Sequence, residues 1–168
     1  VAVAEFEAVV SGDIYVLANG LFCSQDNGFT WQRLPTCADA YLNYSPLAVN
    51  SRGDVFIAGS HNGPVLYRTP DHGQSWQTVR VAGLCGIQQL FIDQADRLFG
   101  IGSWGCLPRC FRSDDSGAHW TALRNDLTCF AFFNGKTYSG TNKGFFLTSD
   151  DHGDSWTDST FLCPEGLT

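Results

Sequence analysis

The 168-residue sequence predicts an all-β protein built from four repeats, each a sheet of four short antiparallel strands. Three observations lead to this prediction. The octet Ser/Thr-x-Asp-x-Gly-x-x-Trp occurs four times, and short β-rich runs flank each copy. Aromatic residues make up 14% of the chain beside 18 glycines, a mixture typical of short strands joined by tight turns.

The octets occupy residues 24–31, 69–76, 113–120 and 149–156. Their Asp and Ser/Thr side chains can accept hydrogen bonds from nearby backbone N–H groups, and Gly suits a positive φ. Each Trp then opens the next strand and can pack its indole between neighbouring sheets. We therefore expect structural turns, not catalytic groups, at Asp26, Gly28, Trp31, Asp71, Gly73, Trp76, Asp115, Gly117, Trp120, Asp151, Gly153 and Trp156.

Two β-rich runs precede each octet. The first runs are 13–17, 54–58, 97–101 and 136–139, and the second are 21–23, 65–68, 110–112 and 144–148. A further apolar run upstream, such as 47–49 or 89–92, completes four strands, which make one propeller blade. We expect one domain over 1–168, with blades near 1–35, 36–80, 81–124 and 125–160 and a closing segment at 161–168. The four blades either close a ring alone or form part of a larger propeller.

The octets resemble the Asp-box, or BNR, repeat of the sialidase-like β-propeller superfamily, and the resemblance spans nearly the whole chain. That superfamily includes sialidases, xyloglucan-cleaving glycosidases, sortilin-type receptors and a photosystem assembly factor. The resemblance implies a propeller whose boxes lie on the face away from an active site. A sialidase would also need an arginine triad and an Arg-Ile-Pro motif, and the sequence lacks that motif. Only Asp39 and Glu165 offer carboxylates on the expected face, and nothing pairs them for glycoside hydrolysis.

Charge and composition exclude several partners. The net charge is −7, and no basic stripe is present, so nucleic acid is not an expected partner. No apolar run is long enough for membrane insertion. The chain contains no Met and no visible cleavable signal, which indicates a mature or excised segment. Seven cysteines without zinc-type spacing favour disulfides in a secreted or periplasmic protein.

Four cysteines are periodic and two are close neighbours. One interpretation of the periodic set is a metal-binding ring of thiolates, and the favoured one is two disulfides that link successive blades. Cys106 and Cys110 suit a local loop bridge, which leaves Cys23 as a small buried residue. The periodic set is Cys37, Cys85, Cys129 and Cys163. No metal or cofactor is expected, since a solvated acidic turn is favoured over a calcium site at Asp150, Asp151, Asp154 and Asp158.

The third blade departs from the repeat at residues 102–110, which we interpret as a long loop between its second and third strands. In a propeller such loops share one face, opposite the boxes. That face would gather His61, Asn62, Trp104, Arg109, Asn142 and Lys143. Trp104 either stacks on a sugar or anchors a protein partner, or it folds back over the loop's own disulfide.

The sequence thus predicts a non-catalytic extracellular binding or scaffold module that recognises a glycan or a protein through this face. The alternative is a glycoside hydrolase domain of the sialidase-like type, or a fragment of one. Self-association is expected if the four blades do not close alone. Histidines 72, 119 and 152 are predicted to be solvated turn residues.

Overall fold

The computed structural model describes residues 5–8, 12–36, 45–60, 64–80, 84–104 and 107–161. These residues form four separate antiparallel sheets of four strands each, which confirms the predicted all-β class. In every sheet the strands pair in chain order, as consecutive hairpins. We call the sheets blades 1 to 4 along the sequence.

Blade 1 contains β1 (Glu5–Ala8), β2 (Ile14–Ala18), β3 (Gly20–Ser24) and β4 (Gln32–Leu34). Blade 2 contains β5 (Leu47–Val49), β6 (Val55–Ser60), β7 (Pro64–Thr69) and β8 (Gln77–Arg80). Blade 3 contains β9 (Leu84–Ile92), β10 (Leu98–Trp104), β11 (Leu107–Ser113) and β12 (Thr121–Ala122). Blade 4 contains β13 (Ala131–Phe133), β14 (Lys136–Gly140), β15 (Phe145–Ser149) and β16 (Thr157–Phe161). Each octet therefore joins the third strand to the fourth, and the fourth strand begins one residue after the octet's Trp.

Alternation along the strands sends side chains to both faces of a blade, since successive residues of a strand point to opposite sides. In β6, Val55 and Ile57 face blade 1, whereas Phe56 and Ala58 face blade 3. Both pairs are fully or almost fully buried. The central strand β6 of a middle blade thus carries apolar residues on both of its faces.

Three buried clusters hold the blades together. The first joins blades 1 and 2 and includes Tyr15, Leu21 and Leu47. The second joins blades 2 and 3 through Leu66 and Phe111. The third joins blades 3 and 4 and includes Phe99, Phe130 and Leu147. The fold is therefore held by face-to-face packing of sheets rather than by one central core.

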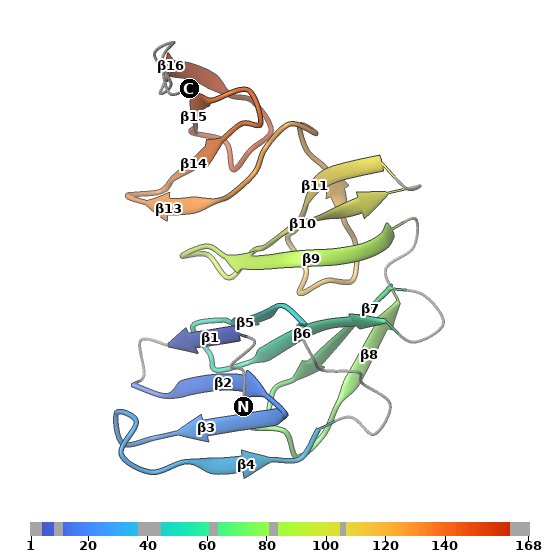
Figure 1. Ribbon diagram of the computed structural model, residues 1–168, viewed down its shortest axis with the longest axis vertical. Coiled ribbons are helices and arrows are strands. Elements are labelled where there is room, and N and C mark those ends of the chain that lie inside the picture. Colours follow the sequence, from blue (N-terminus) through green and yellow to red (C-terminus); the bar gives the residue numbers. More distant parts are fainter. Residues whose placement is uncertain are drawn as a thin grey trace, which may run out of the picture.

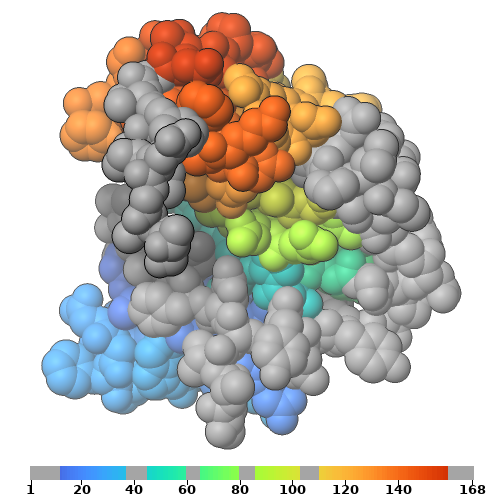
Figure 2. Space-filling model, turned by 45° about the horizontal axis from the view of Figure 1, so that its top comes forward, coloured from blue at the N-terminus to red at the C-terminus, as the bar shows by residue number. Residues whose placement is uncertain are grey.

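The blades follow one another along an arc, with the innermost strands β1, β5, β9 and β13 on its concave side (Figure 1). In the turned space-filling view, blade 1 (blue) and blade 4 (orange to red) lie at opposite ends, with parts of the two middle blades between them (Figure 2). Among the described residues, no helix has the length and apolarity needed to cross a bilayer.

Candidate functional site

The Asp-box turns are held by hydrogen bonds within each octet. In the second box, the Thr69 hydroxyl accepts from the Gly73 N–H and donates to the Asp71 carboxylate, each at 2.8 Å. The same carboxylate accepts from the Ser75 N–H at 2.8 Å. The other three boxes repeat this pattern with Ser in place of Thr. Two hydrogen bonds lower the pKa of the Asp71 carboxyl to about 2: that from the Ser75 hydroxyl has the larger effect, and that from the Ser75 N–H the next largest.

Boxes 2 to 4 also contact the preceding blade. A Cβ on Gly73 would lie 2.8 Å from the Pro35 carbonyl oxygen, and one on Gly117 would lie 2.3 Å from Leu66. The Trp76 indole donates to Pro35 O at 3.0 Å. Among the described residues the first box has no such contact, and its Trp31 is 43% exposed. The indoles of boxes 2 to 4 therefore pack at blade interfaces as expected, whereas Trp31 does not.

Only part of the predicted binding face can be placed. His61 and Asn62 lie outside the described residues. Trp104 ends β10, and Arg109 lies in β11, where the register pairs it with Gly102, two residues from Trp104. Asn142 and Lys143 are exposed on the turn between β14 and β15. Asp39 and Glu165, the carboxylates considered for glycoside hydrolysis, also lie outside the described residues.

The expected loop at 102–110 is wrong. Strands β10 and β11 continue to Trp104 and from Leu107, so the blade 3 hairpin is longer than the others and has a short turn. The reason lies at Gly102, where a Cβ would come within 2.0 Å of the Gly86 carbonyl oxygen. The missing side chain of Gly102 lets β9 and β10 stay paired past a bulge.

The predicted disulfides also need correction, because Cys110 and Cys129 are free thiols. Cys106 lies outside the described residues, and Cys110, the partner expected for it, carries a free, buried thiol. The Cys110 thiol instead donates to the Leu127 carbonyl at 3.4 Å.

Of the periodic set, Cys129 is exposed and accepts from the Gly140 N–H at 3.4 Å, so it does not complete the pair of disulfides predicted for that set. Only the backbone of Cys85 is described. Cys37 and Cys163 lie outside the described residues.

The acidic turn of the fourth box faces cations of the protein itself. Lys136 lies 2.7 Å from Asp150, Arg112 lies 3.0 Å from Asp154, and the Arg124 guanidinium lies 3.9 Å from Asp158. Within the described ranges, no group of three or more His, Cys, Asp or Glu side chains is arranged to hold a metal ion.

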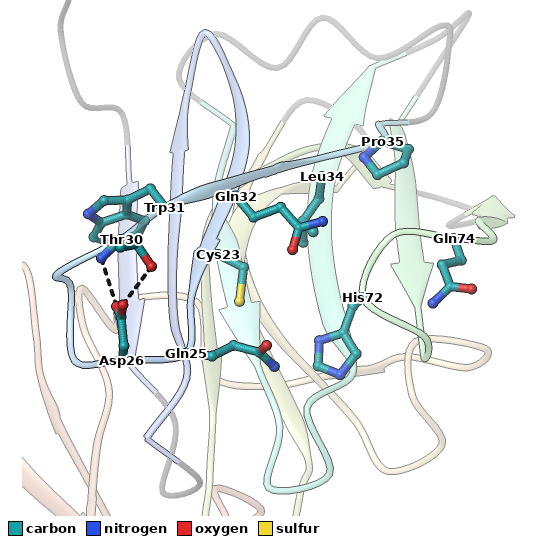
Figure 3. A pocket seen from close by; sticks show the side chains of 10 residues that line it. All are labelled: Cys23, Gln25, Asp26, Thr30, Trp31, Gln32, Leu34, Pro35, His72 and Gln74. Carbon is teal, nitrogen blue, oxygen red and sulfur yellow. Dashed lines mark hydrogen bonds between the residues drawn. The ribbon is translucent and has the colours of Figure 1, made fainter.

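A cavity of about 590 Å³, which the sequence did not predict, lies between blade 1 and the second box. Figure 3 shows the Cys23 thiol, Gln25 and His72 around this cavity, with Gln32 and Leu34 from β4 and with Gln74 at its far side. Asp26, Thr30, Trp31 and Pro35 complete the lining. The ten lining residues thus bring amide groups, a thiol and an imidazole together, with one carboxylate.

On one side of this pocket lie the neutral Cys23 thiol and the His72 ring, which is held in place by a hydrogen bond. Burial raises the pKa of the Cys23 thiol and that of the Tyr15 hydroxyl beside it. The Tyr15 hydroxyl and His72 Nδ1 share a hydrogen bond of 2.8 Å across the blade interface. The His152 ring is held likewise, 2.6 Å from the Arg97 guanidinium. Both rings lie in box turns as predicted, with His72 exposed and His152 half-buried, and each also bonds to the preceding blade.

Comparison with known proteins identifies the fold alone. No protein-family model and no curated protein matches the chain. The solved structure "YCF48 bound to D1 peptide" matches with a TM-score of 0.66 and 16% identity, over 94% of this chain and 52% of that chain. A GH74 enzyme of Niastella koreensis matches with a TM-score of 0.63 and 19% identity, over 87% and 22%. A Hadza microbial sialidase matches with 0.58 and 16%, over 94% and 46%.

These structures are β-propeller proteins, and the present chain has the same fold. It spans about half or less of the length of each of the three. They include enzymes that act on glycans and a protein solved with a bound peptide, so the shared architecture does not select one function.

Proposed function

We propose that this chain is an Asp-box propeller of the sialidase-like superfamily that binds a partner without catalysis, through the end opposite the boxes. The observation that carries the proposal is the long β10–β11 hairpin. Its strands have seven residues each, against five or six in the corresponding hairpins of the other blades. It therefore carries Trp104 two residues beyond the level at which the first-blade hairpin ends, with Arg109 on the neighbouring strand.

Two features support the same end of the molecule. The exposed Asn142 and Lys143 lie on the corresponding turn of blade 4, so polar groups are available beside the hairpin. A tryptophan with a nearby arginine is a typical anchor at interfaces, and an indole also stacks on sugar rings. The peptide bound by the YCF48 structure gives a precedent for partner binding by this fold.

The test compares Trp104→Ala with Phe29→Ala, because Phe29 is an exposed aromatic residue of the first box, at the opposite end of its blade. Wild type and both variants are screened on a glycan array and on a peptide array. We expect at least a tenfold loss of signal for Trp104→Ala and little change for Phe29→Ala. Equal losses in both variants, or no wild-type signal on either array, would refute the proposal.

The second candidate is a glycoside hydrolase of the sialidase-like type, favoured by the likeness to a GH74 enzyme and a sialidase. It is tested by incubating the chain with xyloglucan oligosaccharides and with sialyllactose. Product release that disappears in Asp39→Asn or Glu165→Gln would favour the enzyme over the binding module.

The binding module is further proposed to work in a secreted or periplasmic setting. Seven cysteines in 168 residues support this location. The test is to unfold protein from its native source in denaturant and to count, by intact mass, the thiols that react with maleimide. Fewer than seven reactive thiols before reduction is the expected result, and seven would contradict it.

A further inference from the structure

The interface between blades 3 and 4 contains a guanidinium clamp. Arg112, at the end of β11, is 10% exposed at its side chain and crosses to the fourth box. Its Nη1 donates to the His152 carbonyl at 2.8 Å and to Asp154 Oδ1 at 3.0 Å. Its Nε lies 3.1 Å from Asp114, in its own box. One arginine therefore joins two neighbouring boxes through three acceptors.

Cys23 occupies the equivalent position in blade 1. Both residues directly precede the serine of their box. Cys23 pairs with the aromatic Tyr15 on the second strand, and Arg112 pairs with Phe99. Each also pairs with the residue that follows the box tryptophan on the fourth strand. Replacement of arginine by the smaller cysteine leaves space at the interface between blades 1 and 2.

The acceptors of the clamp have counterparts around that space. His72 holds the box position of His152, Gln74 that of Asp154, and Gln25 that of Asp114. All three line the 590 Å³ pocket together with Cys23. In Figure 3, the Gln25 side chain lies below the Cys23 thiol, and the His72 ring lies beside Gln25. The residues that correspond to the three acceptors of the clamp thus line the pocket, and Cys23 stands in the place of the arginine.

The interface between blades 2 and 3 shows that the acceptors matter. Arg68 holds the same position there, but the third box offers Ala118 where the fourth offers Asp154. Arg68 turns instead to Asp54 of its own blade, at 2.7 Å. An arginine at this position therefore crosses the interface where the next box supplies a side-chain acceptor. The fourth box supplies Asp154, and the second box offers Gln74 at the same position.

We propose that the pocket between blades 1 and 2 binds the guanidinium group of an arginine side chain presented by a protein partner. A planar guanidinium carries five donors in a fixed fork, which suits three acceptors arranged as in the Arg112 clamp. None of the ten lining residues is a lysine or an arginine, and the Asp26 carboxylate adds a favourable charge. The site is separate from the Trp104 end of the molecule, so its test is independent of the function proposed above.

The probes are N-acetyl-arginine methylamide, its citrulline analogue of nearly equal shape without charge, and its lysine analogue. Each is titrated into the full chain while the side-chain amide signals of Gln25 and Gln74 are followed by 15N NMR. We expect both signals to shift with the arginine probe, with a Kd about fivefold lower than for citrulline, because one charge contact near 4 Å in water contributes about that factor. The lysine probe should also bind more weakly than the arginine probe. Equal affinities for arginine and citrulline, or no shift at the two amides, would overturn the proposal.

Two substitutions sharpen the test. Gln74→Asp introduces at the exposed position 74 the carboxylate that the fourth box carries as Asp154. The arginine probe should therefore bind about fivefold more tightly, as reported by the Gln25 signal. Cys23→Arg places the protein's own guanidinium in the pocket and should abolish binding, whereas the control Cys23→Ser should retain it. Unchanged affinity in Gln74→Asp contradicts the site even if Cys23→Arg does not fold.

Discussion

Replacing Gly73 with Ala should push the second Asp-box away from blade 1. The new Cβ would lie 2.8 Å from the Pro35 carbonyl oxygen and 3.2 Å from Leu34 Cβ. That carbonyl also accepts the hydrogen bond of the Trp76 indole, at 3.0 Å. Because the obstructing atom belongs to the backbone, it cannot rotate away as a side chain would, and the box itself must move.

Gly53 supplies the matched control. Both glycines have a φ of +82°, and nothing lies within 4 Å of a Cβ built on Gly53. Each alanine variant therefore carries the same left-handed backbone strain, about 1–2 kcal/mol. Gly73→Ala adds overpacking of about 1–3 kcal/mol and the weakened Trp76 hydrogen bond, about 1 kcal/mol. We expect Gly73→Ala to be less stable than Gly53→Ala by roughly 2–4 kcal/mol.

The measurement is urea unfolding of wild type and both variants, followed by tryptophan fluorescence and far-UV circular dichroism. A lower midpoint with an unchanged slope would report lost stability rather than a changed unfolded state. If the two variants lose the same free energy of unfolding, the contact between box 2 and Pro35 does not stabilise the interface, and the reasoning fails.

Three further predictions concern the same interfaces. Trp120→Ala should lower the free energy of unfolding by about 3–5 kcal/mol, because the Trp120 indole packs edge-on against Phe111. Trp31→Ala should lower it by less than half of that amount, because Trp31 is exposed. Equal urea midpoints of the two variants would contradict this prediction. Arg112→Gln should cost about 2 kcal/mol through its bonds to the fourth box, and salt should narrow the difference from wild type. Stability from the box carboxylates should be complete above about pH 4 and fall toward pH 2, since their folded pKa values lie below the usual 3.9; a flat urea midpoint between pH 5 and pH 2 would refute it. The carboxylates with a pKa of about 2 are Asp26, Asp71 and Asp151.

The candidate sites differ in how far the sequence predicted them. The candidate residues of the Trp104 end were predicted because residues 102–110 break the repeat, although the loop conformation expected for that segment was wrong. Glycine is a common loop signal, yet at Gly102 it permits two strands to approach closely. The pocket was missed, although aligned octets contain its signal. Gln25 and Gln74 stand where the clamp of blades 3 and 4 uses Asp114 and Asp154, and Cys23 stands where it uses Arg112.

The sequence by itself determined the turns and the number of sheets. The hydrogen bonds that shape the turn of a box lie within its octet, so a local pattern such as Ser24 to Trp31 is sufficient to specify the turn. Only the tertiary structure decided how one box meets the blade before it. Cys23 and His72 line one pocket although they lie in different blades. Their proximity follows from the face-to-face packing of two sheets, and no local pattern encodes the distance between such faces.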